Sequence, residues 1–446
     1  MNDWQKAELH AERASQFYDN GQWEKALAEM RSALAVNPDK SDWLFGMGLT
    51  LDAMHRYAEA AACFRRVLGL QGDHVEAMLH LAVDLIRCDQ CRKALKVLAR
   101  VVEQDPDEER AYCHIILAHG RLGEHEAAEQ AFYMARLISD ECVLCYDHMA
   151  KSLAGTECFD RAIWCWKQVV RLDPEYPDVY AHLAGAHWAT GHLERARQFF
   201  LKQLREDPSD TQTLLDFGNL LIDMGRQDEA VEKFRRALEQ DPTNTDAHLH
   251  LGRVALMDDR IEEAARALRE AASIDPERPG IHLRLAEVAV RRGEPDRARA
   301  YLRRELDLTD RDLDQAVELA RMLVDLNMPE PVEALLTPHI DPTARRRRIN
   351  DTGPAMALVC RGVSLMMRGL SSRAVSDFRE ALRRAPQHTG AMYSLSTACA
   401  RLGRMRYAWY WLRRADRICG PSRESRRRKR LLVLATVRAW LARWIA

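Results

Sequence analysis

The sequence predicts an all-α solenoid built from about twelve helix-turn-helix repeats, and three observations predict this fold class. Nine alanines recur without a gap at a spacing of 34 residues, from Ala26 to Ala298. Six prolines, from Pro38 to Pro276, lie at multiples of 34 residues from one another. The composition over 446 residues, with 47% hydrophobic, 30% charged and 7% aromatic residues, is typical of a helix-rich protein and excludes a disordered chain.

Each unit of 34 residues is interpreted as two short helices joined by a turn. A small residue such as Gly48 or Gly252 lies twelve positions before the recurring Ala, which indicates a close crossing of the two helices. Turn glycines, for example Gly21 and Gly123, lie where a helix ends in a backbone conformation with positive φ. The first nine units begin at residues 7, 41, 75, 109, 143, 177, 211, 245 and 279.

The 34-residue frame becomes irregular after Asp312. A degenerate unit starts at Leu313, and two regular units follow from Ala355 and Thr389. The surplus residues lie in Asp341–Pro354, whose Pro, Gly and Arg content predicts an exposed loop and the candidate boundary. We therefore expect nine contiguous acidic repeats in 1–312, a degenerate repeat with an Arg-rich loop in 313–354, two repeats in 355–422 and a basic amphipathic helix in 423–446.

The unit resembles the tetratricopeptide repeat. The segment from Thr211 to Asn244 carries the pattern most fully, with Gly218, Gly225, Ala230, Phe234, Ala237 and Pro242. This resemblance covers nearly the whole chain and implies a right-handed superhelix whose first helices line a concave groove. It implies little about the ligand, because the shared residues build the superhelix and residues outside the motif select the partner.

The sixth position of the first helix supplies the candidate groove residues. Helical geometry turns this position away from the apolar core positions. Five of the sixteen histidines occupy it. They could have been inherited by repeat duplication, or they could form a ladder of hydrogen-bond donors and acceptors, similar to the Asn ladder with which some family members hold an extended peptide. The candidate residues are His80, His114, His148, His182, Asp216, His250 and Arg284.

The eleven cysteines are expected to be free thiols, because no secretion signal precedes the repeats. Cys88 and Cys91 are predicted in a turn, whereas Cys142 and Cys145 are predicted at the start of a unit. These two pairs would lie on opposite edges and could not share an ion. A chain of metal ligands along Cys113, His114, Cys145 and His148 is conceivable, but no ligand geometry is encoded. We predict no metal and no cofactor.

The charge divides along the chain. Residues 341–446 hold 24 Lys and Arg against 6 Asp and Glu, whereas residues 1–340 hold 42 against 61. The acidic part favours a net-basic partner. The basic part ends in an amphipathic helix with an apolar stripe that includes Val433 and Trp440. This helix would cap the last repeat, bind an anionic membrane or bind nucleic acid. Its candidate contacts are Arg426, Arg427, Arg428, Lys429 and Arg430.

The pattern predicts a non-enzymatic protein–protein interaction scaffold that binds an extended peptide or protein segment in the groove. It has no Gly-rich phosphate loop, nucleophile elbow or paired metal-binding His motif, and we expect no catalytic residue and no small-molecule substrate. The alternative is an adaptor tethered to an anionic membrane or nucleic acid through its basic C-terminal helix. Since no targeting signal is encoded, we expect a cytoplasmic protein, or a peripheral membrane protein if that helix binds lipid.

Overall fold

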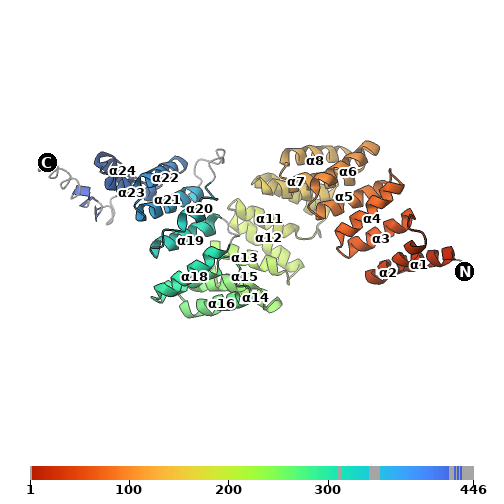
Figure 1. Cartoon of the computed structure of the whole chain (residues 1–446), viewed down its shortest axis with the longest axis horizontal. Helices are drawn as coiled ribbons and strands as arrows, with labels where there is room; N and C mark the ends of the chain where they lie inside the picture. The colour runs from red at the N-terminus through yellow and green to blue at the C-terminus, as the bar shows by residue number, and fades with distance from the viewer. Residues whose placement is uncertain are drawn as a thin grey trace. The chain divides into compact units, whose positions relative to one another are not determined.

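The computed structural model describes residues 3–308, 313–340 and 352–420, together with residues 426, 427, 429, 430, 432 and 433. Within these residues the chain forms 24 helices and no strand (Figure 1). The chain divides into two compact units, Met1–Met224 and Gly225–Ala446. The all-α helix-pair architecture predicted from the 34-residue period is confirmed.

The first compact unit contains the helices α1 to α13. Most first helices begin at the residue that the repeat frame predicts, for example Ser41, Val75 and Glu109. The bounds are α1 Asp3–Asp19, α2 Trp23–Val36, α3 Ser41–Ala53, α4 Tyr57–Leu70, α5 Val75–Arg87, α6 Cys91–Gln104, α7 Glu109–Arg121, α8 His125–Ile138, α9 Val143–Gly155, α10 Phe159–Leu172, α11 Val179–Ala189, α12 Leu193–Glu206 and α13 Thr211–Asp223.

The second compact unit contains the helices α14 to α24. The degenerate repeat is present as α19 and a single-turn α20, because Pro329 and Pro331 precede and shorten the second helix. The bounds are α14 Gln227–Gln240, α15 Thr245–Met257, α16 Ile261–Ile274, α17 Ile281–Arg291, α18 Pro295–Asp307, α19 Leu313–Asp325, α20 Val332–Leu336, α21 Thr352–Met367, α22 Ser371–Arg384, α23 Thr389–Arg401 and α24 Met405–Cys419.

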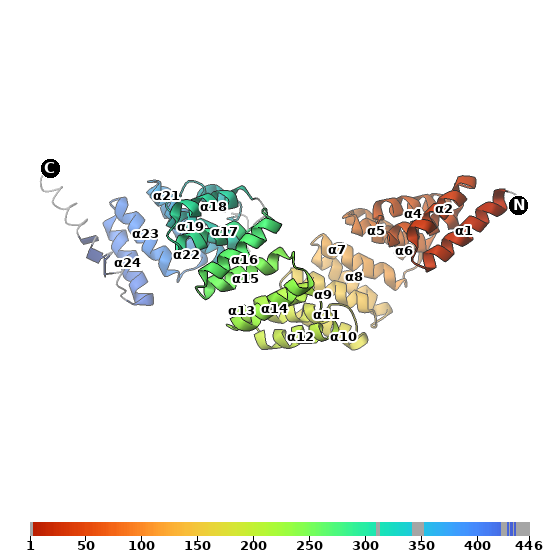
Figure 2. The ribbon, with the colours of Figure 1, turned by 90° about the horizontal axis from the view of Figure 1, so that it is seen from below.

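Within each unit, helices that follow one another in sequence pack together, as the turned view shows (Figure 2). First helices of successive repeats also contact each other directly, as α5 does with α7 and α7 with α9. The close crossing inside a repeat requires a small residue, because a Cβ atom on Gly48 would lie 2.7 Å from the Phe64 ring. A Cβ atom on Gly252 would lie 2.6 Å from Leu268. The predicted role of the small residues is therefore confirmed at these crossings.

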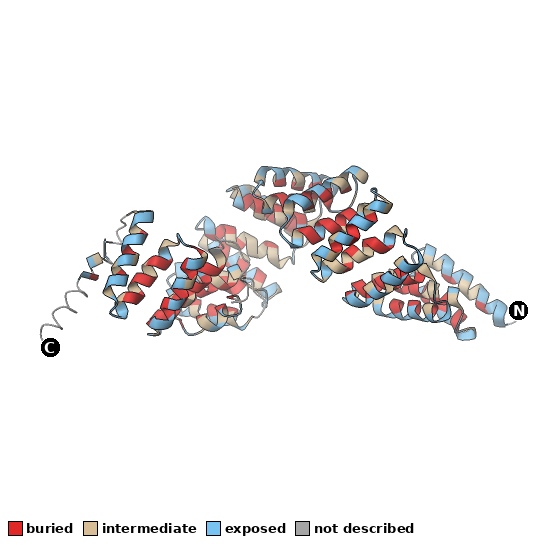
Figure 3. Cartoon of the chain, turned by 90° about the horizontal axis from the view of Figure 1, so that it is seen from above, coloured by how far each residue is buried: buried red, intermediate tan, exposed pale blue. Residues whose placement is uncertain are grey.

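The core of each unit lies along the sides of the helices that face their neighbours (Figure 3). All nine alanines from Ala26 to Ala298 that define the repeat are 0% exposed. Any larger side chain at these positions would separate the two helices of its repeat, since protein interiors leave few voids. The alanine period therefore records the helix–helix contact that recurs in every repeat.

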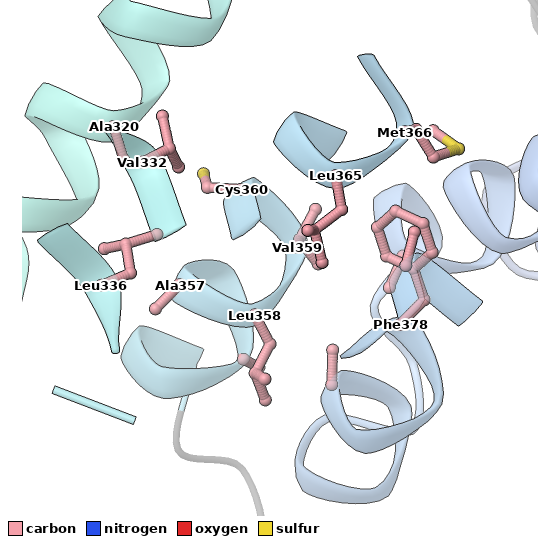
Figure 4. Close-up of a cluster of buried hydrophobic side chains, with 14 of the residues drawn as sticks. Ala320, Val332, Leu336, Ala357, Leu358, Val359, Cys360, Leu365, Met366 and Phe378 are labelled. Atoms are coloured by element: carbon pink, nitrogen blue, oxygen red, sulfur yellow. The ribbon is translucent and has the colours of Figure 1, made fainter. Parts of the chain in front are cut away.

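The degenerate repeat is part of a continuous core. One cluster of buried side chains runs from Leu283 to Leu432, across the irregular part of the sequence frame. Figure 4 shows Val332 and Leu336 of α20 beside Ala357 and Cys360 of α21. The helix α21 starts at Thr352, three residues before the predicted start of that unit. Residues 341–351 of the predicted loop lie outside the described residues.

The described part of the C-terminal tail packs on the last repeat. Leu432 is 5% exposed and belongs to the same core as Leu412 of α24. Lys429 forms an ion pair with Asp416 of α24 at 2.7 Å. Val433, which the sequence placed on the apolar stripe, is 48% exposed, so the buried register differs by one residue. Arg428 and residues 434–446 lie outside the described residues. Every helix among the described residues is too short or too polar to cross a lipid bilayer.

Candidate partner-binding groove

The seven candidate residues at the sixth position are partly buried in the structure. This differs from the fully solvated face expected from helical geometry, and the cause is an aromatic contact between repeats. His80 stacks on Phe64 with ring centroids 5.4 Å apart, and His250 stacks on Phe234 at 5.1 Å. His182 lies 5.3 Å from Trp166. In each case the aromatic residue is on the second helix of the preceding repeat.

The stacking explains part of the histidine recurrence. The aromatic residue and the histidine are separated by 16 residues at all three contacts, from Phe64 to His80, from Trp166 to His182 and from Phe234 to His250. An imidazole ring covers the aromatic face and still keeps two nitrogen atoms for hydrogen bonds. The sequence signal for this role was present, because the bulky residues and the histidines share the 34-residue period.

Two ladder histidines have defined hydrogen bonds. The Nδ1 atom of His182 donates to the carbonyl oxygen of Asp178 at 2.7 Å. The Nδ1 atom of His148 donates to the carbonyl oxygen of Cys113 in the preceding repeat at 3.0 Å. Since a carbonyl only accepts, Nδ1 carries the proton in both rings. In the neutral ring this leaves Nε2 as a hydrogen-bond acceptor for a partner.

Burial keeps several ladder histidines neutral at physiological pH. Desolvation lowers the pKa of His114 and of His250 to about 4. It also lowers the pKa of His80 and of His148, because the imidazolium form loses hydration when it is covered by neighbouring side chains. The Nδ1 atom of His114 is buried and has no hydrogen-bond partner among the described residues. These side chains therefore act through hydrogen bonds and packing, not through positive charge.

Arg284 differs from the other candidates because it is already paired inside the protein. Its guanidinium group binds the carboxylate of Glu318, the sixth-position residue of the next repeat, through two contacts of 2.6 Å. A further contact of 3.2 Å joins it to Glu287. The ion pairs raise the pKa of Arg284 despite its burial. The prediction that Arg284 contacts a partner is not supported by this geometry, since a partner would have to compete with two carboxylates.

A hollow of 470 Å³ brings two candidate residues together in the first unit. His182 of α11 and Asp216 of α13 both line it, and Asp178 and Asp210 supply two further carboxylates. No Lys or Arg is among the residues that line the hollow. Burial raises the pKa of Asp216, whose carboxylate accepts a hydrogen bond from Gln212 at 3.2 Å. The apolar part of the wall comes from Phe159, Trp166 and small residues of α9 and α11.

The cysteine pairs lie where the sequence predicted. Cys88 ends α5 at the turn, and Cys142 caps the N-terminus of α9. The structure additionally brings Cys142 and Cys145 together with Cys113 of α7, a grouping that the sequence reading missed. The signal for it was weak, because Cys113 lies 29 and 32 residues away from the other two.

Sequence comparison settles the family. Two family profiles described as tetratricopeptide repeat match the chain, one at residues 12–52, 215–280 and 361–423 and the other at 53–113, 159–215 and 255–323. Together these matches span most of the sequence and follow the repeat frame. The chain belongs to the tetratricopeptide repeat family. The predicted membership and fold are thereby confirmed.

Individual relatives of this tetratricopeptide repeat protein are distant. It is 25% identical over 133 residues to the Caenorhabditis elegans tetratricopeptide repeat-containing protein trd-1, and the match spans 30% of this chain and 17% of that relative. Among solved structures, the Cut9–Hcn1 hetero-tetramer of the APC/C is 12% identical, with a TM-score of 0.47 over 94% of this chain and 95% of that chain. Yeast Tom70 is 16% identical, with a TM-score of 0.40 over 97% and 96%.

Proposed function

We propose that this tetratricopeptide repeat protein is a non-enzymatic scaffold that holds an extended, net-basic protein segment along the first helices of residues 1–224. The observation that carries the proposal is the acidic hollow bounded by α9, α10, α11 and α13. Asp178, Asp210 and Asp216 place three carboxylates around one space. None of them forms an ion pair with a Lys or Arg of the described residues, so a cation from a partner is the missing counter-charge.

The surrounding groups suit a peptide more than a free ion. The Nε2 atom of His182 accepts hydrogen bonds, and a peptide backbone N–H is a suitable donor. The aliphatic stem of a Lys or Arg would lie along the apolar wall near Phe159 while its charged end reaches the carboxylates. Elsewhere on the same face, acidic groups are already neutralised within the protein, as Glu76 is by Arg110 at 2.7 Å. This contrast favours the hollow as the principal site for a basic side chain.

The test uses two fluorescent, unstructured peptide pools of equal length, one rich in Lys and Arg and one rich in Asp and Glu. We expect the full chain to bind the basic pool more tightly. The double variant Asp178→Asn and Asp216→Asn should weaken this binding about tenfold or more, which corresponds to about 1.4 kcal/mol. Asp210 is left unchanged because its carboxylate caps α13 through the Thr213 N–H.

The matched control is Glu194→Gln, which removes an exposed carboxylate from α12 outside the hollow. It should leave the affinity for the basic pool unchanged. Preference for the acidic pool, or equal binding by the double variant and the wild type, would refute the proposed site. Circular dichroism of each variant checks that the helices are retained.

The alternative function, an adaptor tethered through the basic tail, is favoured by the exposure of Arg426, Arg427 and Arg430. Lys429 is less available because it pairs with Asp416. If the three arginines bind an anionic surface, changing them to Gln should abolish binding to phosphatidylserine vesicles or to duplex DNA, and wild-type binding should fall steeply with salt. Unchanged sedimentation with vesicles and unchanged DNA binding would exclude this function.

A further inference from the structure

Three cysteine side chains converge between the first helices of two successive repeats. The Sγ atom of Cys113 in α7 lies 2.8 Å from Sγ of Cys145 and 3.0 Å from Sγ of Cys142. All three sulfur atoms lie within 4.8 Å of one another. Cys113 and Cys145 are 2% and 1% exposed, and Cys142 is partly buried. The site is therefore sheltered and has one more open side.

Local structure orients these sulfur atoms. Cys142 caps the N-terminus of α9, and its Sγ accepts the backbone N–H of Cys145 at 3.3 Å. The first turn of α9 thus holds both sulfur atoms on the side that faces α7. One turn later, His148 binds the carbonyl oxygen of Cys113 at 3.0 Å and ties the two helices together beside the cluster. A helix N-terminus also favours the thiolate form, which is the form that binds metal.

The number and spacing of the sulfur atoms favour a metal ion over a disulfide. A disulfide requires about 2.05 Å between two sulfur atoms and would leave the third thiol unpaired. Around tetrahedral zinc, with Zn–S bonds of about 2.3 Å, sulfur atoms lie roughly 3.8 Å apart. The observed separations of 2.8 and 3.0 Å would have to widen by about 1 Å or less. The carboxyl group of Glu109, hydrogen-bonded to Cys142, places an oxygen donor at the same site.

We propose that Cys113, Cys142 and Cys145 bind one thiophilic cation, and that Zn²⁺ is the ion that this donor set fits. Three thiolates with a neighbouring carboxylate match the sulfur and oxygen ligands that zinc accepts in four-coordinate sites. Binding replaces the thiol protons with the ion, so protons are released to solvent and no oxidant is needed. The ion would join α7 to α9. The sequence had predicted no metal, because it did not indicate that Cys113 approaches the other pair.

The experiment uses the full chain, reduced and freed of metal, titrated with Zn²⁺ against a chromophoric chelator. We expect one Zn²⁺ per chain, and Co²⁺ in its place should show the absorption of thiolate-to-metal charge transfer. The variants Cys113→Ser, Cys142→Ser and Cys145→Ser should each weaken Zn²⁺ binding more than tenfold. Zn²⁺ should raise the melting temperature of the wild type and not of these variants, since it stabilises only a folded chain with an intact site.

The matched control is Cys165→Ser, because Cys165 is a buried free thiol of α10 in the same unit outside the cluster. This variant should bind Zn²⁺ like the wild type. Absence of Zn²⁺ binding by the reduced wild type, or undiminished binding by the Cys113, Cys142 and Cys145 variants, would overturn the proposal. So would a disulfide within the cluster, detected by mass spectrometry after alkylation of the native protein. Cys142→Ala, at the partly exposed position, provides a second variant if a buried serine prevents folding.

Discussion

At the turn between the two helices of each repeat, one residue adopts a left-handed backbone conformation. Glycine occupies this position in several repeats, as at Gly123 with φ of 71° and Gly191 with φ of 78°. Glu157 occupies the equivalent position with φ of 60°. A residue with a Cβ atom is strained there, whereas glycine is not. The turn therefore retains its geometry even where the sequence does not favour it.

Replacing Glu157 with Gly should accordingly stabilise its repeat. We expect the free energy of unfolding to rise by about 0.5–1 kcal/mol, because relief of the strain exceeds the extra entropy of glycine in the unfolded chain. Urea denaturation followed by circular dichroism measures the change. Gly191→Ala is the reverse control and should destabilise the protein. A less stable Glu157→Gly variant would show that the side chain, which is exposed, makes a compensating contact.

The buried ladder histidines should make stability depend on pH. The pKa of His114 is about 4 in the folded chain, below its ordinary value of 6.5, so the unfolded chain binds the proton first. Stability is therefore fully present above pH 6.5 and is lost as the pH falls from about 6.5 to 4. His114→Gln should reduce this loss by up to about 1.4 kcal/mol per pH unit. Unfolding free energies of both proteins at pH 7, 6 and 5 provide the measurement, and identical pH profiles would contradict the assignment.

At the scale of the helices, arginines join one repeat to the next. The guanidinium group of Arg121 donates to the carbonyl oxygen of Ile86 at 2.7 Å, and Arg401 donates to Met366 at 2.6 Å. Each donor is at the end of a first helix, and each acceptor is in the last turn of a preceding first helix, where carbonyl groups lack a partner within the helix. The positive charge also interacts favourably with the C-terminal end of the helix dipole.

Arg401→Met should therefore loosen the contact between α21 and α23. Losing one charged hydrogen bond at a partly buried carbonyl should cost about 1.5–3 kcal/mol. Hydrogen exchange in the last turn of α21, measured by mass spectrometry, should accelerate relative to the wild type. Arg406→Met, at an exposed position of α24, serves as the control and should leave this exchange unchanged. Equal exchange in all three proteins would show that water satisfies the carbonyl equally well.

At the scale of the whole molecule, unfolding should not be a single two-state transition. The chain divides into two compact units, residues 1–224 and 225–446, and within them each repeat contacts mainly its neighbours. Stability in such arrays is close to a sum of local terms, so separate parts unfold at different temperatures. Scanning calorimetry should give a calorimetric enthalpy greater than the van't Hoff enthalpy. Equality of the two enthalpies would demonstrate one cooperative unit.

The sequence by itself determined the family, the number of repeats and nearly every helix start. These features repeat with the 34-residue period and depend on interactions between residues close in sequence, such as the turn glycines and the Ala26 to Ala298 series. It also identified His182 and Asp216, which the structure brings into one hollow. For these reasons the repeat frame and part of the candidate groove were predictable.

Only the tertiary structure decided how side chains of neighbouring repeats use that frame. It showed that His80 stacks on Phe64, that Arg284 is occupied by Glu318, and that Cys113 meets the sulfur atoms of the next repeat. Helical periodicity gives the direction of a side chain around its own helix. Contacts between repeats depend also on the separation and rotation of two helices, which are set by the packing of all the side chains between them.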